Sequence, residues 1–218
     1  VGVIIALDGP SGSGKSTVSK RVAERLGLSY LDTGAMYRAA AWWCINRGID
    51  LDDHDAVAEA TVEMPLEMPL DPNDQRIMCG GGEITEAIRE PELSRLVSKV
   101  ATNLRVRSEM KRRQRQIIKA ARMGMIAEGR DITTVVVRVL LTASEETRLA
   151  RRAREVRGSD DPKALDATRD EVLRRDADDS TVSEFMRAKD GVTTIDSSAL
   201  GIEEVVEAVV SLVPKELR

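Results

Sequence analysis

The sequence of 218 residues lacks three features, and each absence excludes a class of protein. No apolar run approaches the roughly 20 residues that a membrane helix needs, and we expect no signal peptide because a strand pattern already begins at Val3. With a formal net charge of −4, the chain has no basic excess for binding nucleic-acid backbones. Its two cysteines, Cys44 and Cys79, show neither metal-ligand spacing nor a disulfide framework, which fits a reducing compartment. We therefore expect a cytoplasmic protein that binds neither nucleic acid nor membranes.

Apolar runs and helical patterns alternate along most of the chain, which is long enough for one main core. The apolar runs predict strands at Val3–Leu7, Ser29–Leu31, Met123–Ala127, Val135–Leu141 and Val192–Ile195. Helical spacing predicts helices at about Gly34–Asn46, Asp53–Ala60, Glu92–Asn103, Val106–Arg122, Glu145–Val156, Lys163–Ala177 and Ile202–Leu212. This alternation is typical of an α/β protein, and we expect a three-layer fold with a five-stranded parallel sheet.

One stretch, Glu63–Ile84, interrupts this alternation. It reads EMPLEMPLDPNDQRIMCGGGEI and contains prolines, a β-like run and a triple glycine, but no helical period. We expect a small inserted antiparallel lobe here. The glycines at 80–82 favour a hairpin turn over a second phosphate loop, because neither a lysine nor a helix follows them.

The segment GPSGSGKS, Gly9–Ser16, fits the phosphate-loop pattern and lies between a predicted strand and a predicted helix. Glycines let backbone N–H groups point inward at anionic oxygens, and the following helix adds its unsatisfied N-terminal amides. Lys15 should then reach the β- and γ-phosphates, and Ser16 should give its hydroxyl oxygen to Mg²⁺. The loop therefore predicts ATP binding by Gly9, Pro10, Ser11, Gly12, Ser13, Gly14, Lys15, Ser16 and Thr17.

Two other strands end in polar residues that should lie at the same edge of the sheet as this loop. YLDTGAMYR, Tyr30–Arg38, follows the second strand, and MIAEGRD, Met125–Asp131, ends the third. In open α/β sheets, ligands bind at the carboxyl ends of the strands. Arg38 and Arg130 beside a phosphate loop therefore indicate a second anionic ligand.

These segments carry a resemblance to a known family. The chain resembles bacterial-type cytidylate kinases, nucleoside monophosphate kinases of the P-loop class, through DGPSGSGKST, YLDTGAMYR, AIRE, VSKVATNLRVR, AEGRDI, RRD with DDS, and TIDSSAL, in order along almost the whole chain. The resemblance implies a P-loop NTPase fold and the transfer of a phosphoryl group from ATP, with Mg²⁺, to CMP and dCMP. It also implies a monomer that forms one kinase domain over 1–218, with a core of 1–60, 104–145 and 178–218, an NMP-binding lobe of 61–103 and a lid of 146–177.

Carried over to this sequence, the resemblance assigns CMP to Thr33, Tyr37, Arg38, Ser98, Arg107, Arg130, Asp131, Arg175 and Asp179. The chemistry of these side chains is consistent with the assignment. Asp131 can accept a hydrogen bond from the cytosine amino group, while Arg107 and Ser98 can donate to the acceptor atoms of the cytosine ring. Arg38 and Arg130 suit the α-phosphate, since a guanidinium can donate to two oxygens, and together with Lys15 they are the expected catalytic residues. Arg175 and Asp179 are expected at the ribose.

Five arginines lie close together on the helix before GSDDP. Like charges three and four residues apart weaken an isolated helix, so we expect a bound anion to balance these positive charges. The resemblance makes this helix part of a lid over ATP, with Arg148 and Arg152 as ATP-binding residues. A second cluster of basic residues has no ligand in the family pattern, and we expect it to form a solvated basic face. Its members are Lys111, Arg112, Arg113, Arg115 and Lys119.

Two departures leave questions open. Neighbouring parallel strands need a crossover of about a dozen residues, yet only seven residues separate Arg130 from Arg138, so either the crossover is compressed or residues are missing between Val135 and Arg138. Val182 also stands where the family pattern places an arginine. We expect Arg187 to supply the guanidinium, the alternative being an enzyme with one phosphate contact fewer.

Two other functions remain open from the sequence. A P-loop kinase for another small acceptor, of the dephospho-coenzyme A or shikimate type, shares the first segments but does not explain Ser98, Arg107 and Asp131 together. A nucleotide-dependent switch also needs the loop, but it has no need for so many arginines around a second anion.

Overall fold

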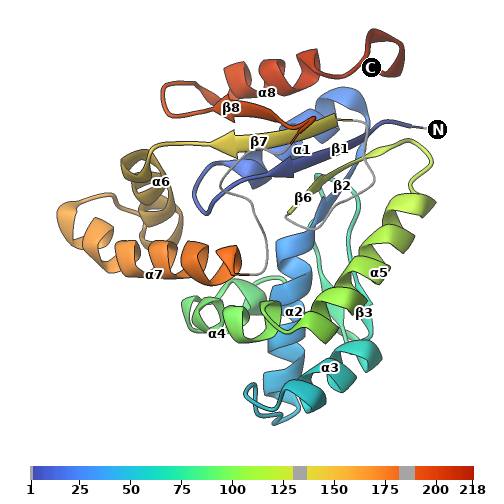
Figure 1. Ribbon diagram of the computed structural model, residues 1–218, viewed down its shortest axis with the longest axis vertical. Coiled ribbons are helices and arrows are strands. Elements are labelled where there is room, and N and C mark those ends of the chain that lie inside the picture. The colour runs from blue at the N-terminus through green and yellow to red at the C-terminus, as the bar shows by residue number, and fades with distance from the viewer. Residues whose placement is uncertain (1, 130–136, 182–189) are drawn as a thin grey trace.

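The computed structural model describes residues 2–129, 137–181 and 190–218. A five-stranded parallel sheet in the order β2-β6-β1-β7-β8 forms its centre (Figure 1). The strands are β1 (Ile4–Asp8), β2 (Ser29–Asp32), β6 (Met125–Glu128), β7 (Val137–Thr142) and β8 (Thr193–Asp196). All five expected strands are confirmed, with ends that shift by up to two residues; Val135, where the fourth was expected to begin, lies outside the described residues.

Each expected helix is also confirmed. The α-helices are α1 (Lys15–Leu26), α2 (Thr33–Asn46), α3 (His54–Glu63), α4 (Pro91–Ala101), α5 (Leu104–Ala120), α6 (Glu145–Arg157), α7 (Pro162–Ser180) and α8 (Ile202–Ser211), with 3₁₀ turns at Ala87–Arg89 and Lys215–Leu217. The helix expected at Glu92–Asn103 ends earlier than predicted because Asn103 caps α5, its side chain accepting from the N–H groups of Arg105 and Val106.

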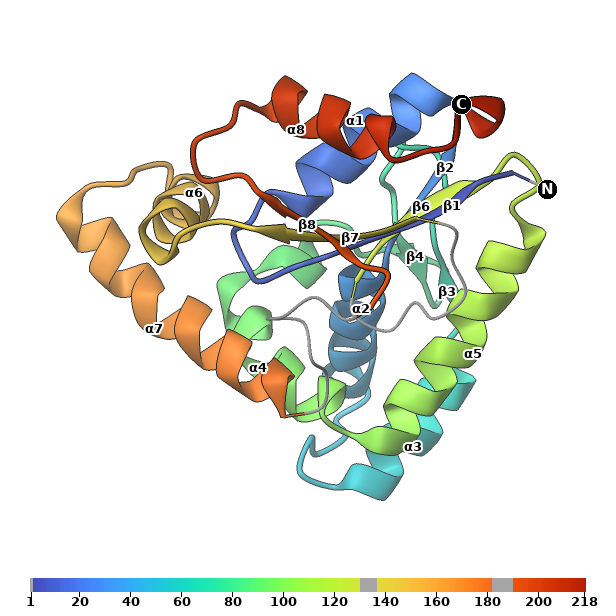
Figure 2. The same ribbon diagram turned by 45° about the horizontal axis from the view of Figure 1, so that its top comes forward.

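Helices cover both faces of the sheet (Figure 2). On one face, Ile5 and Leu7 of β1 pack with α1 and α8, whose buried side chains include Val22 and Val206. On the other face, Met125 and Ala127 of β6 pack with the helices α2 to α5. Successive strand residues thus point to opposite faces, as the period of a strand requires. The three-layer arrangement places the carboxyl ends of all five strands at one edge, beside α6 and α7.

The inserted lobe is confirmed as antiparallel. Its strands β3 (Leu66–Glu67), β4 (Met78–Cys79) and β5 (Gly82–Glu83) form a separate three-stranded sheet. Gly80 and Gly81 connect β4 to β5 with φ of 62° and 82°, the left-handed conformation that a two-residue hairpin turn needs at both positions. The triple glycine is therefore a turn, as expected.

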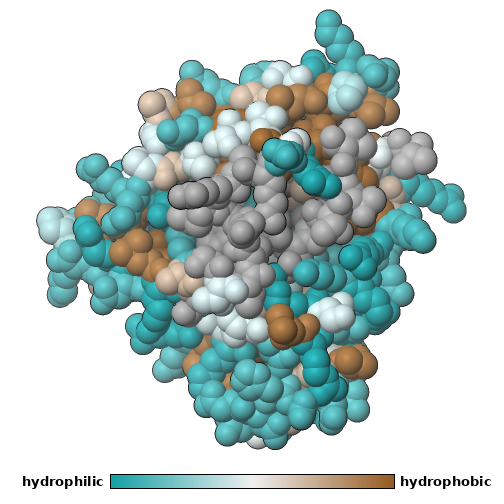
Figure 3. Space-filling view, viewed as in Figure 1, coloured by the Kyte–Doolittle hydropathy of each residue, from teal (hydrophilic) through white to brown (hydrophobic). Residues whose placement is uncertain are grey.

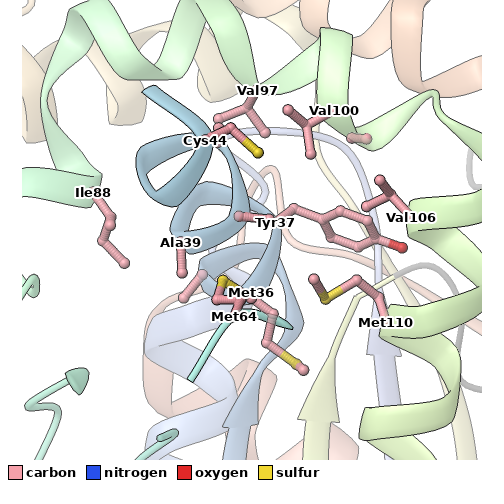
Figure 4. Packing of buried hydrophobic residues seen from close by; sticks show 14 of the residues in the cluster. Met36, Tyr37, Ala39, Cys44, Met64, Ile88, Val97, Val100, Val106 and Met110 are labelled. Atoms are coloured by element: carbon pink, nitrogen blue, oxygen red, sulfur yellow. The ribbon is translucent and has the colours of Figure 1, made fainter. Parts of the chain in front are cut away.

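The helices below the sheet share one apolar cluster (Figure 4). Tyr37 of α2 points toward Val106 and Met110 of α5, while Met36 lies near Met64 at the end of α3. Both cysteine thiols, Cys44 and Cys79, are free and buried, and burial raises the pKa of each. Within the described ranges, no helix combines the length and hydrophobicity that crossing a bilayer takes.

The short link between β6 and β7 does not join neighbours, because β1 lies between them. Glu128 pairs with Leu7 and Val137 with Ile5, so the chain must cross one strand and descend by two residues. At about 4.8 Å between strands and 3.3 Å per residue, this distance is on the order of 12 Å. An extended chain of residues 129–136 spans about 26 Å. The strands that the link joins are thus not neighbours, but residues 130–136 lie outside the described residues, so both interpretations of the short link stay predictions.

Arg113 has a structural role that the sequence did not predict. Its guanidinium donates to the carbonyls of Thr61, Val62 and Met64 at 2.8–3.0 Å, and also to Glu109. The last carbonyls of an α-helix have no partner within the helix, and here the cation satisfies those of α3. The expected solvated basic face thus contains at least one partly buried arginine that is hydrogen-bonded within the protein.

We expect Arg113→Ala to lower the free energy of unfolding by about 1.5–3 kcal/mol, the usual contribution of hydrogen bonds to a charged group. Arg112→Ala is the matched control, because Arg112 is half exposed and bonds to Glu109 and Gln116 of its own helix. Urea denaturation of both variants measures the difference. Equal losses of stability in the two variants would contradict the capping role.

Candidate active site

The phosphate loop connects β1 to α1, and its shape depends on glycine. Gly9 has φ of 148°, and a Cβ there would lie 2.1 Å from the carbonyl oxygen of Leu141. Gly12 has φ of 77°, and a Cβ there would lie 2.5 Å from the carbonyl oxygen of Arg148. L side chains rarely adopt these conformations, and here they would also clash with backbone. The loop therefore packs closely against β7 and α6.

Lys15 begins α1, at the helix end where backbone N–H groups lack intrahelical partners. Its ammonium donates to the carbonyl of Gly9 at 2.7 Å and to that of Pro10 at 2.8 Å. The side chain is thus folded onto the loop that it was predicted to serve. The lysine, the helix dipole and the loop amides together make a site for an anion.

Glu128, at the end of β6, is a buried carboxyl group beside the loop. Its Oε1 accepts from the hydroxyl of Ser16 at 2.9 Å and from that of Tyr30 at 3.0 Å. Its Oε2 has no hydrogen-bond partner among the described residues. Burial, reinforced by the negative charge of Asp32, raises the pKa of Glu128 to about 7, against the attraction of Lys15.

Asp32, at the end of β2, lies beside Glu128, because the two residues are paired in the sheet. Asp32 accepts from Arg38 at 2.8 Å and caps α2 by accepting from the N–H of Ala35 at 2.7 Å. Burial acts to raise the pKa of Asp32, but the charge and hydrogen bond of Arg38 outweigh it, so the pKa lies below its usual value. The two neighbouring carboxyl groups thus differ, with Asp32 ionised and Glu128 close to its midpoint at neutral pH.

The raised pKa of Glu128 predicts a pH dependence of stability. A carboxyl group whose pKa is higher in the folded state binds its proton more tightly there, so stability falls as pH rises from about 4.5 to about 7. Glu128→Gln keeps the shape and cannot titrate. We expect the free energy of unfolding of the variant, relative to the unchanged protein, to increase by up to about 3 kcal/mol between pH 5 and pH 8. Urea denaturation at both pH values checks this, and a constant difference would rule out a raised pKa.

The helices α6 and α7 are docked on the phosphate loop by charged side chains. Arg148 of α6 donates to the carbonyl of Ser11 at 3.0 Å and to Asp176 of α7 at 2.5 Å, and Asp176 accepts from the N–H of Ser11 at 3.1 Å. Arg151 donates to Ser13 O at 3.3 Å and to the hydroxyl and carbonyl of Ser197 at 2.9 Å and 2.8 Å. The arginine-rich helix therefore lies at the donor loop.

Of the two arginines assigned to ATP, the structure places one at the loop. Arg148 is buried and bonds to loop backbone. Arg152 forms an ion pair with Glu155 at 3.1 Å on its own helix. Arg151, which was not among the assigned residues, also contacts the loop, at Ser13, and bonds to Ser197.

Three acceptor residues lie on or beside α2. The hydroxyl of Thr33 donates to the carbonyl of Glu128 at 2.7 Å, and Arg38 bonds to Asp32. The guanidinium of Arg107, on α5, lies 6.0 Å from the ring centre of Tyr37. These contacts join the first turns of α2 to the ends of β6 and β2, and they join Tyr37 to α5.

Ser98 is partly buried on α4, where its carbonyl accepts from Thr102. Arg130, Asp131, Val182 and Arg187 lie outside the described residues. Arg175 and Asp179 lie on α7, but their side chains are also outside the described part. The assignments of these residues to CMP therefore stay predictions.

Six residues at the site were not among the predicted ones: Tyr30, Asp32, Glu128, Arg151, Asp176 and Ser197. Glu128 and Asp32 each end a buried strand next to the phosphate loop, a position that favours ligand contact. RRD and TIDSSAL, which contain Asp176 and Ser197, were quoted for the resemblance without a role for these residues. For Arg151, the arginine crowd was the only signal.

Comparisons with known proteins match almost the whole chain to one family. A family profile described as cytidylate kinase matches residues 5–215. A cytidylate kinase of Cutibacterium acnes is 45% identical over 223 residues, which cover 99% of this chain and 98% of that protein. A cytidylate kinase of Streptomyces avermitilis is 42% identical over 221 residues, with 98% of this chain and 94% of that protein covered. A bifunctional pantoate ligase/cytidylate kinase of Prochlorococcus marinus is 42% identical over 230 residues, with 98% and 46% covered.

Proposed function

Because the chain belongs to the cytidylate kinase family and is a nucleoside monophosphate kinase acting on CMP, we propose that ATP is its phosphoryl donor, that CDP and ADP are its products, and that dCMP is a second acceptor. Family membership decides against the two alternatives, a kinase for another small acceptor and a nucleotide-dependent switch. One observation carries the proposal. Glu128 and Asp32, paired across β6 and β2, bring Ser16 of the donor loop and Arg38 of the acceptor side into one cluster.

We propose that ATP binds with Mg²⁺ at Ser16 and Glu128. Hydroxyl and carboxylate oxygens are the ligands that Mg²⁺ prefers, and the buried Oε2 of Glu128 has no partner among the described residues. A carboxyl group with a pKa of about 7 loses its proton to a cation at little cost. Among the described residues, no three His, Cys, Asp or Glu side chains form a cation site, so water and phosphate must complete the shell. When bound, Mg²⁺ supplies charge neutralisation on the transferred phosphate.

We propose that the acceptor lies between α2, α4 and α5. Thr33, Tyr37, Arg38, Ser98 and Arg107 are the described residues of this site, with Arg130, Asp131, Arg175 and Asp179 beyond them. Support comes from Arg38, whose guanidinium lies largely buried on Asp32 while its Nε has no hydrogen-bond partner among the described residues. A buried guanidinium with an unused N–H is suited to a phosphate oxygen.

In this proposal, the side chains act mainly by positioning the two substrates and by neutralising the charges of their phosphates. The phosphate oxygen of CMP is already anionic at neutral pH, so no general base is required. Lys15 neutralises charge on the donor phosphates, and Arg38 with Arg130 neutralises the acceptor phosphate, so that two anions can approach in line. We propose that residues 61–103 form the acceptor lobe and residues 146–177 the lid, whose docking on the loop excludes water.

We also propose that the enzyme is a monomer without a nucleic-acid partner. Large exposed hydrophobic side chains among the described residues are spread over separate elements: Ile45, Val62, Leu104, Met123, Leu173, Ile202 and Leu217. On the face shown in Figure 3, the hydrophobic areas are likewise separate and surrounded by hydrophilic residues. Such scattered residues do not form the continuous apolar patch that a stable interface needs.

A coupled assay of ADP release tests these proposals. We expect turnover with ATP plus CMP or dCMP, and little ADP release with ATP alone. UMP should be used about 5- to 150-fold less efficiently, because uracil would leave buried partners of cytosine unpaired at a cost of about 1–3 kcal/mol. EDTA should abolish turnover. ADP release at the same rate without an acceptor would support a nucleotide-dependent ATPase instead.

A further inference from the structure

One residue of the phosphate loop, Ser11, is held at both its N–H and its carbonyl by a buried ion pair. The N–H of Ser11 donates to Oδ1 of Asp176 at 3.1 Å, and the carbonyl of Ser11 accepts from Arg148 at 3.0 Å. Arg148 in turn donates to Oδ2 of Asp176 at 2.5 Å. The side chains of Arg148 and Asp176 are only 7% and 8% exposed. The position of Ser11 is therefore fixed by α6 and α7 together.

The same turn of α7 carries residues proposed for the acceptor. Arg175 precedes Asp176 in the helix, and Asp179 lies three positions after it. A helix moves as a rigid element over so short a distance, so a ligand bound at Arg175 and Asp179 also places Asp176. Asp176 is thus the point at which the proposed acceptor helix contacts the donor loop.

We infer that Asp176 is a positioning residue that couples the acceptor site to the phosphate loop. With CMP held by α7, Asp176 keeps Ser11 and Arg148 in the arrangement that binds ATP, and each nucleotide therefore strengthens the binding of the other. The inference rests on the proposed assignment of Arg175 and Asp179 to CMP. It goes beyond that assignment because Asp176 itself is assigned to neither nucleotide.

The chemistry of the pair supports a coupling role. A buried arginine that loses its carboxylate partner is left with an uncompensated charge. Arg148 would then turn away or draw in water, and it would release the carbonyl of Ser11 as well. Removal of one carboxylate charge thus disturbs both contacts to the loop. Thermodynamic linkage requires that the effect be reciprocal, so CMP must alter ATP affinity by the factor with which ATP alters CMP affinity.

The experiment uses calorimetry to measure the Kd of the non-hydrolysable analogue AMP-PNP with Mg²⁺, once without CMP and once with saturating CMP. The ratio of the two Kd values is the coupling factor. In the unchanged protein we expect CMP to lower the Kd about fivefold or more, the usual range of such couplings. In Asp176→Asn the factor should fall to about 1, while the Kd for CMP alone stays within about twofold. A factor near 1 in the unchanged protein, or an unchanged factor in Asp176→Asn, would overturn the inference.

Arg157→Met is the matched control. Arg157 also ties α6 to α7, because its guanidinium donates to Thr168 Oγ1 and to the carbonyl of Ala167 at 3.0 Å each. It should keep the coupling factor of the unchanged protein, and an equal loss in this variant would show that general loosening of the helices is responsible. If Asp176→Asn does not fold, Asp176→Glu carries the test, because it keeps the charge but shifts the carboxylate. A factor reduced at least about twofold supports coupling, and an unchanged factor opposes it.

Arg175→Ala and Asp179→Ala separate the inference from the assignment on which it rests. A Kd for CMP that does not change in either variant would refute the assignment of these residues to the acceptor. A weaker Kd for CMP together with an unchanged coupling factor in Asp176→Asn would refute the coupling alone.

Discussion

Lys15→Ala is expected to lower kcat by at least about 10²- to 10³-fold, the loss found when one preorganised charge partner of a transition state is removed. Lys15 lies at the start of α1 and donates to the carbonyls of Gly9 and Pro10, in the loop proposed to hold the donor phosphates. The described residues proposed for the acceptor lie on α2, α4 and α5 instead. The Kd for CMP, measured by calorimetry, should therefore stay within about twofold.

No neighbouring arginine described here is placed to replace this lysine. Arg148 is bound to Ser11 and Asp176, and Arg151 is bound to Ser13 and Ser197, so both cations are already used in docking the helices. Lys20→Ala is the control on the same helix, since Lys20 lies against the ring of Tyr30 at 5.7 Å. It should keep kcat nearly unchanged. A loss of CMP affinity in Lys15→Ala that matches its loss of turnover would contradict separate donor and acceptor sites.

The sheet and the donor loop could be predicted because their signals are local. A strand such as Ile4–Asp8 is a short apolar run, and the loop after it is defined by glycines and a lysine at fixed spacing. The turn at Gly80 and Gly81 was equally local, since two consecutive glycines suit a two-residue hairpin. Features of this kind need no knowledge of which elements become neighbours.

The buried carboxyl cluster could not be predicted in the same way, because it depends on strand order. Glu128 meets Asp32 only because β6 inserts between β1 and β2, and that order is not visible in either segment. The comparison of the β6–β7 link with a crossover between adjacent strands failed for the same reason, because β1 lies between these two strands. Arg113 was missed because its partners are backbone carbonyls of α3, about 50 positions away in the sequence. Contacts between residues so far apart in the sequence are determined by the packing of the elements and not by a local sequence pattern.

Arg38→Met should raise the KM for CMP about 10- to 100-fold and leave the KM for ATP unchanged. The range follows from the loss of a charge-assisted contact to phosphate, worth about 1.5–3 kcal/mol. Arg38 is suited to this contact because Asp32 holds one edge of its guanidinium at 2.8 Å, while its buried Nε has no hydrogen-bond partner among the described residues. The carboxylate thus orients the guanidinium and leaves a donor for the acceptor phosphate.

A fair test must separate this role from the loss of a buried ion pair, because Arg38→Met also leaves Asp32 without its cation. Asp32→Asn/Arg38→Met removes both charges and keeps a side chain that can cap α2. If Arg38 binds the phosphate, the double variant should recover stability in urea denaturation but not the KM for CMP. Arg47→Met, at the other end of α2 with its guanidinium 5.1 Å from the ring of Trp43, should change neither KM. An unchanged KM for CMP in Arg38→Met, or an equal rise in the KM for ATP, would remove Arg38 from the acceptor site.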